Sequence, residues 1–201
     1  MDVLADTGCA VAHNPIANLR LGVGVAPVAR MLERGIPVGL GTDGLAINDR
    51  ADLFEVMRSA ALISRCGAEP SNWLGAEDVL HAATRGGAQC AFLEHDLGTL
   101  EVGAPADIVL IRSPAEPLLP EGMVTSVVFS AGSEHVDTVI VGGRVVVSEG
   151  VVHGVNEVEI RAELEEYVPS LREWQLEVET QNGDLRPLLE EIHARSAAVP
   201  L

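Results

Sequence analysis

Short apolar segments alternate with amphipathic segments in the first half of the chain. Residues 8–13 and 36–40 are apolar at successive positions, which predicts two strands buried on both faces. Residues 25–34, 51–65 and 76–92 carry apolar side chains three and four positions apart, which predicts helices. Strands and helices that alternate with short loops predict a parallel α/β sheet, and either a barrel or a doubly wound sheet satisfies this pattern.

The pattern changes after residue 95, where β-branched residues dominate. Residues 98–112, 124–130 and 136–147 are β-rich, and Gly142-Gly143 divides the last of these segments into two arms. Two glycines between two such arms are a strong signal for a hairpin turn. We therefore expect residues 96–156 to form a small antiparallel β unit, following an α/β unit over residues 1–95.

The last segment, residues 157–201, is predicted to be helical and acidic, with interruptions at Pro169 and Pro187. An apolar stripe at helical spacing runs along it with glutamates on the opposite face, formed by Ile160, Leu164, Val168 and Leu171. This stripe favours a solvated helix packed on its own domain over a partner site. An oligomer contact through the tail remains an alternative.

Composition and charge restrict the partners of this chain. It has 201 residues, 47% of them hydrophobic and 3% aromatic, so Val, Leu, Ile and Ala must fill the core. The formal net charge of −17 argues against nucleic acid and anionic membrane surfaces as partners. All thirteen basic residues are Arg, which excludes Schiff-base chemistry, a lysine nucleophile and a carbamylated-lysine metal bridge on this chain.

Cysteine usage and targeting signals bear on location. Cys9, Cys66 and Cys90 are odd in number, far apart and without a CxxC pair, so neither a disulfide framework nor a zinc knuckle is indicated. The sequence shows neither a secretory leader nor an apolar run of membrane-spanning length. We therefore expect a cytoplasmic protein.

Two polar residues follow the two predicted parallel strands, His13 after GCAVA and Asp43 after IPVGLGT. Side chains at the carboxyl ends of parallel barrel strands converge on one mouth, so we expect both residues at the same cavity. A carboxylate and an imidazole suit a divalent cation such as zinc, and a carboxylate beside a metal-bound water can accept its proton. Asp43 has the residue type and position for that role.

Each candidate has a plainer alternative. Asp43 could form an Asx turn or cap the following helix, and His13 could be hydrogen-bonded to loop backbone beside Asn14-Pro15. Residues 39–44 also match the GxGxxG dinucleotide fingerprint. An acid inside that loop opposes pyrophosphate binding, and the segment about twenty residues on is predicted helical, so the fingerprint is discounted.

The order of motifs makes a family resemblance visible. Residues 13–21 (HNPIANLRL) resemble the H-[CN]-P-x-[SA]-N-x-[KR]-L segment of the amidohydrolase superfamily, in the branch of guanine, methylthioadenosine/S-adenosylhomocysteine and triazine deaminases and chlorohydrolases. The match runs from about residue 3 to 155. Further matching segments follow in order: VGLGTDG at 38–44, Asn48, an AT..GA helix at 83–88, a G-[ST]-L…A-D strand pair at 98–109 and a terminal hairpin at 136–150.

The resemblance implies the last strands and helices of a (β/α)8 barrel of the TIM type, with a β-sandwich beside it. It implies that Asp43 is the family's metal-ligating aspartate, which also accepts a proton from the hydrolytic water. The implied cofactor is a divalent metal, zinc with iron as an alternative. His13 matches a residue beside the pocket and is expected to contact a small heterocyclic substrate.

The rest of the family's site has no counterpart in this sequence. The family also uses an HxH pair after the first strand, a His after the fifth, a further His after the sixth and an acid near the fifth-strand His. We therefore expect an incomplete barrel, inactive alone, that is a fragment or follows a start placed at an internal Met. The leading hypothesis is deamination of a purine-like or other N-heterocycle. The alternatives are dechlorination at the same site, a non-catalytic remnant acting through oligomer contacts, and a dinucleotide-binding module.

Overall fold

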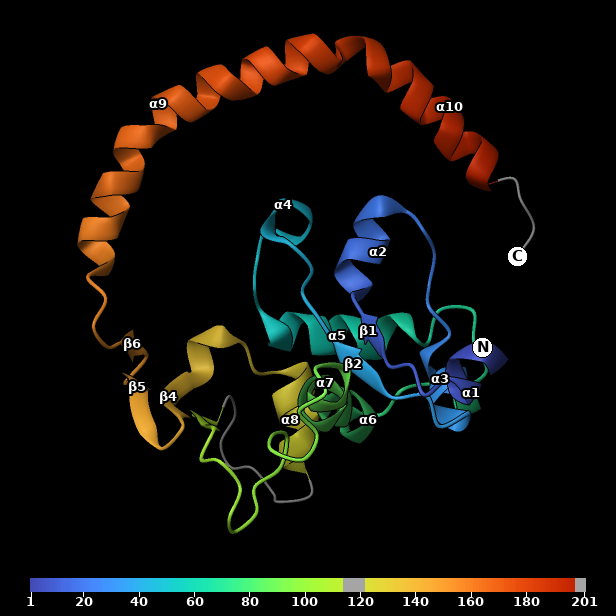
Figure 1. The fold of residues 1–201 in the computed structure, drawn as a ribbon, viewed down its shortest axis with the longest axis vertical. Coiled ribbons are helices and arrows are strands. Elements are labelled where there is room, and N and C mark those ends of the chain that lie inside the picture. Colours follow the sequence, from blue (N-terminus) through green and yellow to red (C-terminus); the bar gives the residue numbers. More distant parts are fainter. Residues whose placement is uncertain (114–121, 198–201) are drawn as a thin grey trace. The chain divides into compact units, whose positions relative to one another are not determined.

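The computed structural model describes residues 1–113 and 122–197, and these residues form two compact units, Met1–His153 and Gly154–Leu201 (Figure 1). The first unit contains, in chain order, α1 (Asp2–Asp6), β1 (Val11–His13), α2 (Pro15–Leu21), α3 (Val28–Glu33), β2 (Val38–Leu40), α4 (Leu45–Asn48), α5 (Leu53–Ile63), η1 (Pro70–Asn72), α6 (Ala76–His81), η2 (Ala82–Gly86), α7 (Gly87–Cys90), β3 (Ile108–Ile111), α8 (Met123–Phe129), η4 (Ser133–His135), β4 (Val136–Val141), β5 (Arg144–Ser148) and β6 (Val151–Val152).

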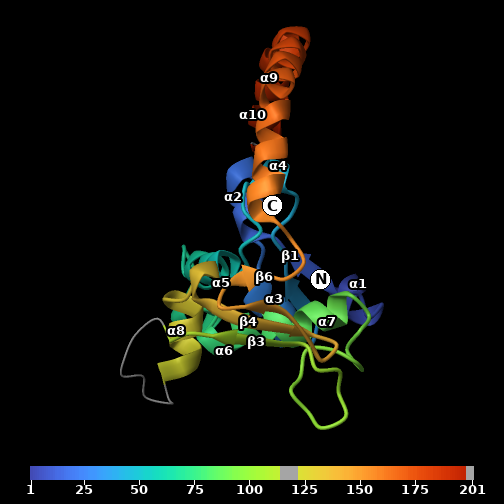
Figure 2. The same cartoon turned by 90° about the vertical axis from the view of Figure 1, so that its left-hand side faces the viewer.

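A parallel pair of strands lies at the centre of the first unit. Strands β1 and β2 pair with Val11 opposite Val38 and His13 opposite Leu40, and α2 and α3 connect them. The predicted strand-helix-strand unit with a parallel sheet is therefore confirmed. The described residues contribute only these two strands to the parallel sheet, so no closed barrel is formed. Helices α2 and α4 contact each other on the side where both strands end (Figures 1 and 2).

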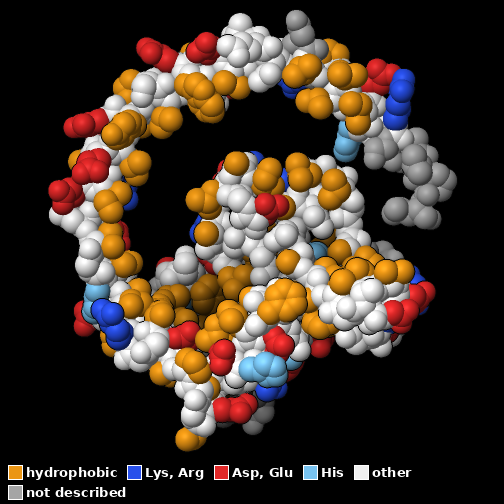
Figure 3. Space-filling view, in the orientation of Figure 1, with side chains coloured by type: hydrophobic (Ala, Val, Ile, Leu, Met, Phe, Trp, Pro, Cys, Tyr) orange, Lys and Arg blue, Asp and Glu red, His pale blue; other side chains and the backbone are white. Residues whose placement is uncertain are grey.

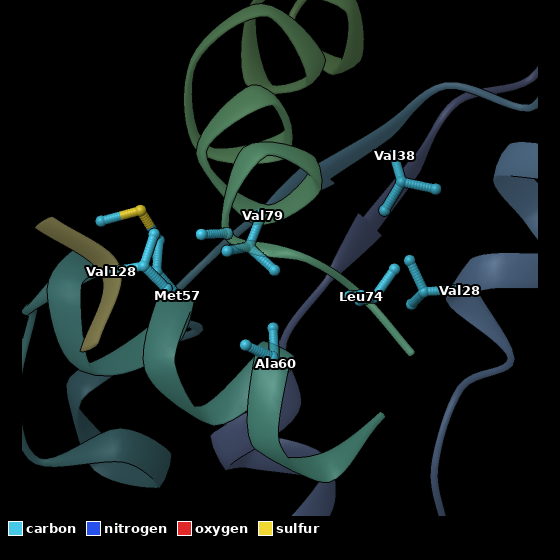
Figure 4. Packing of buried hydrophobic residues seen from close by; sticks show 9 residues of the cluster. Val28, Val38, Met57, Ala60, Leu74, Val79 and Val128 are labelled. Carbon is cyan, nitrogen blue, oxygen red and sulfur yellow. The ribbon is translucent and has the colours of Figure 1, made fainter. Parts of the chain in front are cut away.

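Small aliphatic side chains form the core against this strand pair, as the low aromatic content predicts. Val38 on β2 is 1% exposed and packs in one cluster with Met57 and Ala60 of α5, Val79 of α6 and Val128 of α8 (Figure 4). Burying each of the larger aliphatic side chains contributes about 1.5–3 kcal/mol relative to leaving it exposed. Helix α5 thereby lies against β2, and its beginning is fixed by Asp52, which accepts hydrogen bonds from the backbone N–H groups of Phe54 and Glu55.

The helical run α6–η2–α7 approaches β2 closely enough to require glycine. A Cβ atom on Gly86 would overlap the carbonyl oxygen of Val38, and a Cβ on Gly39 would lie 2.9 Å from the Cys90 sulfur. The Cys90 thiol also lies 3.4 Å from the Val11 carbonyl oxygen, which it contacts as a weak donor. The one-turn π-helical segment η2 lies at this close approach. This run matches the single helix expected over residues 76–92.

The predicted antiparallel β unit is present as one sheet of four strands in the order β3-β4-β5-β6. Gly142 and Gly143 both have positive φ, 55° and 78°, in the turn between β4 and β5, which confirms the predicted hairpin. A second sheet that would complete a sandwich is not formed within the described part of the chain.

The prediction of β structure over residues 124–130 is wrong, because this segment lies in α8. Its valines favour a strand by local propensity, but helical spacing lets Val124, Val127 and Val128 pack on the α5–α6 core. Arg58 on α5 adds hydrogen bonds from Nε to the Phe129 carbonyl (3.1 Å) and from Nη2 to the Ala131 carbonyl (2.6 Å). Tertiary packing therefore overrides local preference here.

The second unit is a long helical segment. It contains α9 (Glu157–Asn182), η5 (Gly183–Leu185) and α10 (Arg186–Ala197). Helicity is confirmed, but the interruption predicted at Pro169 is wrong, because α9 continues through this residue. Pro187 is the second residue of α10, where a missing N–H costs little. Within residues 1–113 and 122–197, no helix combines the length and apolar character needed to cross a membrane.

Candidate functional site

Asp43 lies in the loop that leaves the carboxyl end of β2. The residue is exposed and adopts a left-handed backbone conformation with φ of 61°. Such a conformation is uncommon for a residue with a side chain, but it is tolerated by aspartate. The loop therefore presents one carboxylate at the end of the parallel strand pair.

Asn48 holds this loop from both sides of Asp43. Its side chain is buried, and Nδ2 donates a hydrogen bond of 2.7 Å to the carbonyl oxygen of Thr42. Its backbone N–H donates a hydrogen bond of 3.0 Å to the carbonyl oxygen of Gly44. The two bonds bracket Asp43, so we assign Asn48 a positioning role that residue patterns alone did not reveal.

The Asp43 carboxylate does not serve as a helix cap. Gly44 is the N-cap of α4, and no side-chain hydrogen bond caps that helix. Asp43 Oδ1 instead accepts a hydrogen bond of 2.6 Å from the Gly44 N–H. The capping alternative is therefore not supported. Asp43 is exposed and its carboxylate forms no ion pair with another described residue, so its second oxygen can take a cation or a water.

His13 ends β1 and is 3% exposed. Its Nδ1 atom is buried without a hydrogen-bond partner among the described residues, so the proposed backbone hydrogen bond is not formed at this atom. Leaving a buried polar atom unsatisfied costs about 1–3 kcal/mol. Burial lowers the pKa of His13, because the charged imidazolium loses hydration in the interior. The ring is therefore neutral near pH 7.

The structure brings the two strand ends together but gives their side chains different surroundings. The Gly41 N–H donates a hydrogen bond of 3.0 Å to the His13 carbonyl, and a Cβ on Gly41 would overlap the Asn14 side chain. Asp43 and His13 thus belong to adjoining strand ends, as the parallel pattern predicts. The imidazole is enclosed, however, whereas the carboxylate is exposed.

The described residues do not form a complete metal site. They contain no group of three or more His, Cys, Asp or Glu side chains that could hold an ion. A catalytic zinc normally takes three protein ligands and a water. The oxygen of Asp43 is chemically suited to such an ion, but one carboxylate is not enough, so further ligands would have to come from outside this set of residues.

The GxGxxG segment lacks the surroundings of a dinucleotide site. The loop after β2 leads into α4, which has four residues, and the next strand, β3, belongs to the separate antiparallel sheet. A dinucleotide-binding unit instead places a second parallel strand beside the first after a full crossover helix. The fold therefore agrees with discounting the fingerprint.

The parallel strand pair, with an acidic residue after its second strand, has the arrangement found at the carboxyl ends of strands in α/β barrels. A family model described as "Amidohydrolase family" matches residues 1–146. The chain belongs to the amidohydrolase family, which confirms the resemblance seen in its motifs.

Two curated relatives illustrate the similarity. The chain is 48% identical over 145 residues to a 5-methylthioadenosine/S-adenosylhomocysteine deaminase of Desulforudis audaxviator. The aligned residues make up 72% of this chain and 34% of that relative. It is 41% identical over 151 residues to a 5'-deoxyadenosine deaminase of Methanothermobacter thermautotrophicus. Here the aligned residues make up 75% of this chain and 35% of the relative. The chain thus spans about a third of the length of these relatives.

Solved structures share the fold. An adenosine deaminase from Xanthomonas campestris with bound zinc has a TM-score of 0.80 at 27% identity, covering 85% of this chain and 39% of that one. An atrazine chlorohydrolase from Arthrobacter aurescens, complexed with zinc, has a TM-score of 0.75 at 35% identity, covering 82% and 37%. The α/β fold is therefore that of part of an amidohydrolase barrel protein.

Proposed function

We propose that this chain supplies the last-strand carboxylate of a metal-dependent hydrolase that acts on non-peptide carbon–nitrogen bonds, with Asp43 as metal ligand and proton acceptor. The observation that carries the proposal is the position of Asp43, exposed at the end of a parallel strand and bracketed by the two hydrogen bonds of Asn48. Membership of the amidohydrolase family over residues 1–146 supports it.

The proposed substrate is an adenine-like N-heterocycle, and the proposed reaction replaces its exocyclic amino group with oxygen and releases ammonia. The names of the 48% and 41% identical relatives, both deaminases of adenosine derivatives, support this choice. A small neutral or cationic heterocycle also suits a chain with a net charge of −17 better than a polyanion does.

Asp43 would take the proton of the attacking water and return one to the leaving amine. The divalent cation implied by the family, zinc by similarity to the zinc-bound neighbours and iron as an alternative, would lower the pKa of a bound water to about 7. Because the loop bonds of Asn48 fix the backbone on both sides of Asp43, the carboxylate would keep its direction during this transfer.

His13 is proposed as a substrate-side contact. The Nδ1 atom of its neutral imidazole lies at the strand ends and has no partner among the described residues. A hydrogen bond to a ring nitrogen of the substrate or to a bound water would satisfy this atom. A neutral heterocycle suits a neutral imidazole, because no charge has to be buried with it.

Hydrolytic dechlorination at the same site is the second candidate. The 35% identical atrazine chlorohydrolase structure favours it, since water attack on a ring carbon serves both reactions and only the leaving group differs. A non-catalytic role through oligomer contacts of the tail is a third candidate.

A chimera tests the proposal. Residues 1–146 of this chain would replace the matching segment of the Desulforudis audaxviator relative, and release of ammonia from 5'-methylthioadenosine and of chloride from atrazine would be measured. We expect ammonia release, and a loss of about 10²–10⁴-fold in kcat on Asp43→Asn.

The matched control for this substitution is Asp49→Asn. Asp49 is also exposed and left-handed, with φ of 59°, and it pairs with Arg20 on the surface. We expect the Asp49→Asn chimera to keep its rate within a few-fold. Equal rates in the Asp43→Asn and unsubstituted chimeras would contradict the proposed role of Asp43, and chloride release without ammonia release would favour the second candidate.

A further inference from the structure

A regular repeat runs through the whole helical tail. Apolar residues recur there at alternating intervals of four and three positions, and this spacing continues across α9, η5 and α10. We call these ten positions the seam: Ile160, Leu164, Tyr167, Leu171, Trp174, Val178, Gln181, Leu185, Leu188 and Ile192. Nine of the ten are apolar, and Gln181 is the single polar member. An average interval of 3.5 residues sustained over four or more heptads is the pattern of a helix that pairs with another helix.

The seam is exposed along its length. No residue of α9 is buried, and the Ile, Leu, Tyr and Trp side chains of the seam are each 45–63% exposed. Figure 3 shows hydrophobic side chains gathered mainly along one side of this helical segment and acidic ones mainly along the other. A continuous apolar strip of this length on a water-exposed helix indicates an interaction surface.

The residues that disfavour helix all lie off the seam. Pro169 and Gly183 each precede a seam leucine by two positions, and Pro187 follows Leu185 by two. These are outer positions of the heptad, which face away from a partner helix. Helix α9 passes through Pro169, and the four-and-three spacing of the sequence continues across Gly183. Pro169, Gly183 and Pro187 therefore do not occupy contact positions of the repeat.

The charges that flank the seam distinguish a parallel pair of identical helices from an antiparallel pair. On one flank the sequence places Glu163, Ser170, Glu177, Asp184 and Glu191, and on the other it places Arg161, Val168, Gln175, Asn182 and Leu189. In a parallel, in-register pair of identical helices, the first flank of one copy faces the second flank of the other. Glutamates would then face Val168 and Asn182. In an antiparallel pair, acidic flank would face acidic flank, which is unfavourable.

We propose that the tail is a dimerisation element that pairs with the same segment of a second copy as a parallel two-helix coiled coil. Burying the exposed parts of the seam side chains in both copies would remove roughly 1,200 Å² or more from water, which reaches the size of a specific interface. The two Gln181 side chains would meet inside the seam, where a lone polar pair favours one register over shifted ones. This element is independent of the proposed hydrolytic site.

A pair of matched leucines tests the seam. Leu171 lies on it and Leu176 lies on the outer side, and the two are 55% and 64% exposed in the same helix. Sedimentation equilibrium of the 201-residue chain should give a dimer. Leu171→Glu should raise the dimer dissociation constant about 100-fold by placing a carboxylate in an apolar seam, whereas Leu176→Glu should leave it within a few-fold. Circular dichroism checks that both variants stay helical.

The same experiment can overturn the proposed dimer. A monomeric chain at tens of micromolar, or a dimer that Leu171→Glu and Leu176→Glu affect equally, would overturn the proposal. A monomer whose melting temperature falls with Leu171→Glu but not with Leu176→Glu would show that the stripe covers its own chain instead.

Cross-linking tests the parallel direction separately. In a chain carrying Cys9→Ser and Cys66→Ser, Gln181→Cys should form an interchain disulfide with oxidised glutathione, because identical seam positions face each other only in a parallel pair. Leu176→Cys is the control and should stay monomeric under denaturing, non-reducing conditions. Failure of Gln181→Cys to cross-link, or equal cross-linking of both variants, would overturn the parallel arrangement.

Discussion

Two side chains at neighbouring strand ends occupy opposite environments. Asp43 is exposed, whereas His13 is 3% exposed and its Nδ1 has no hydrogen-bond partner among the described residues. Their positions after apolar strands could be predicted from the sequence, because parallel strands end on the same side. Their burial could not be predicted from the sequence, because it depends on how Asn14, Gly41 and the surrounding helices pack. The role of Asn48 also needed the fold, because its two partners are distinguished only by the path of the loop.

The buried imidazole predicts a pH dependence of stability. The folded state lowers the pKa of His13 below its unfolded value of about 6.5, so the unfolded chain binds the proton more readily. The His13 contribution should therefore be fully present above pH 7, decline as pH falls through 6.5, and level off below the folded pKa. Urea unfolding of the wild type and of His13→Gln between pH 5 and 8 measures this difference.

Exposed His81 supplies the control for that measurement. His81→Gln makes the same change of residue type at an exposed position outside the core, and its unfolding is measured alongside. Subtracting the free energies of two proteins that share every other group removes the pH dependence common to both. A wild-type minus His13→Gln difference that is independent of pH would contradict the burial argument.

At the scale of elements, the two parallel strands could be predicted from the pattern of apolar residues and the hairpin from its two glycines. Helix α8 could not be predicted in this way. A valine-rich segment satisfies both a strand and a helix when its apolar residues also recur at helical spacing, and only the α5–α6 core decides between them. Helix α2, which begins at Pro15, was likewise not predicted, because residues 13–21 were interpreted only as a family motif. The close approach of η2 to β2 depends on tertiary packing, which local patterns do not specify.

This close approach predicts opposite effects at two adjacent glycines. Gly86→Ala should lower the free energy of unfolding by about 2–3 kcal/mol, because the new Cβ would overlap the Val38 backbone. A Cβ atom at Gly87 would lie in ordinary contact with the Ala82 carbonyl oxygen, at 3.8 Å, so Gly87→Ala should gain up to about 1 kcal/mol of helix propensity. Chemical denaturation of the two variants compares them, and equal stabilities would contradict the packing described here.

At the scale of the molecule, the chain combines part of an amidohydrolase barrel with an antiparallel sheet and a helical tail. Family membership was visible in the order of motifs, because residues 13–21 and 38–44 keep their types and spacing. The extent of the sheets was not visible in the motifs, because a sandwich of two sheets was expected and the described residues form one antiparallel sheet. The unpaired sides of β1 and β2 in the described structure agree with a chain that spans about a third of its relatives.

Zinc content tests the central claim most directly. The chain alone should hold no stoichiometric zinc, because its described residues offer no set of three ligands. The chimera with the Desulforudis audaxviator relative should hold about one zinc per polypeptide after dialysis, Asp49→Asn should keep it, and Asp43→Asn should lose most of it. Metal analysis by mass spectrometry that finds full zinc in the Asp43→Asn chimera would contradict the assignment of Asp43 as a ligand.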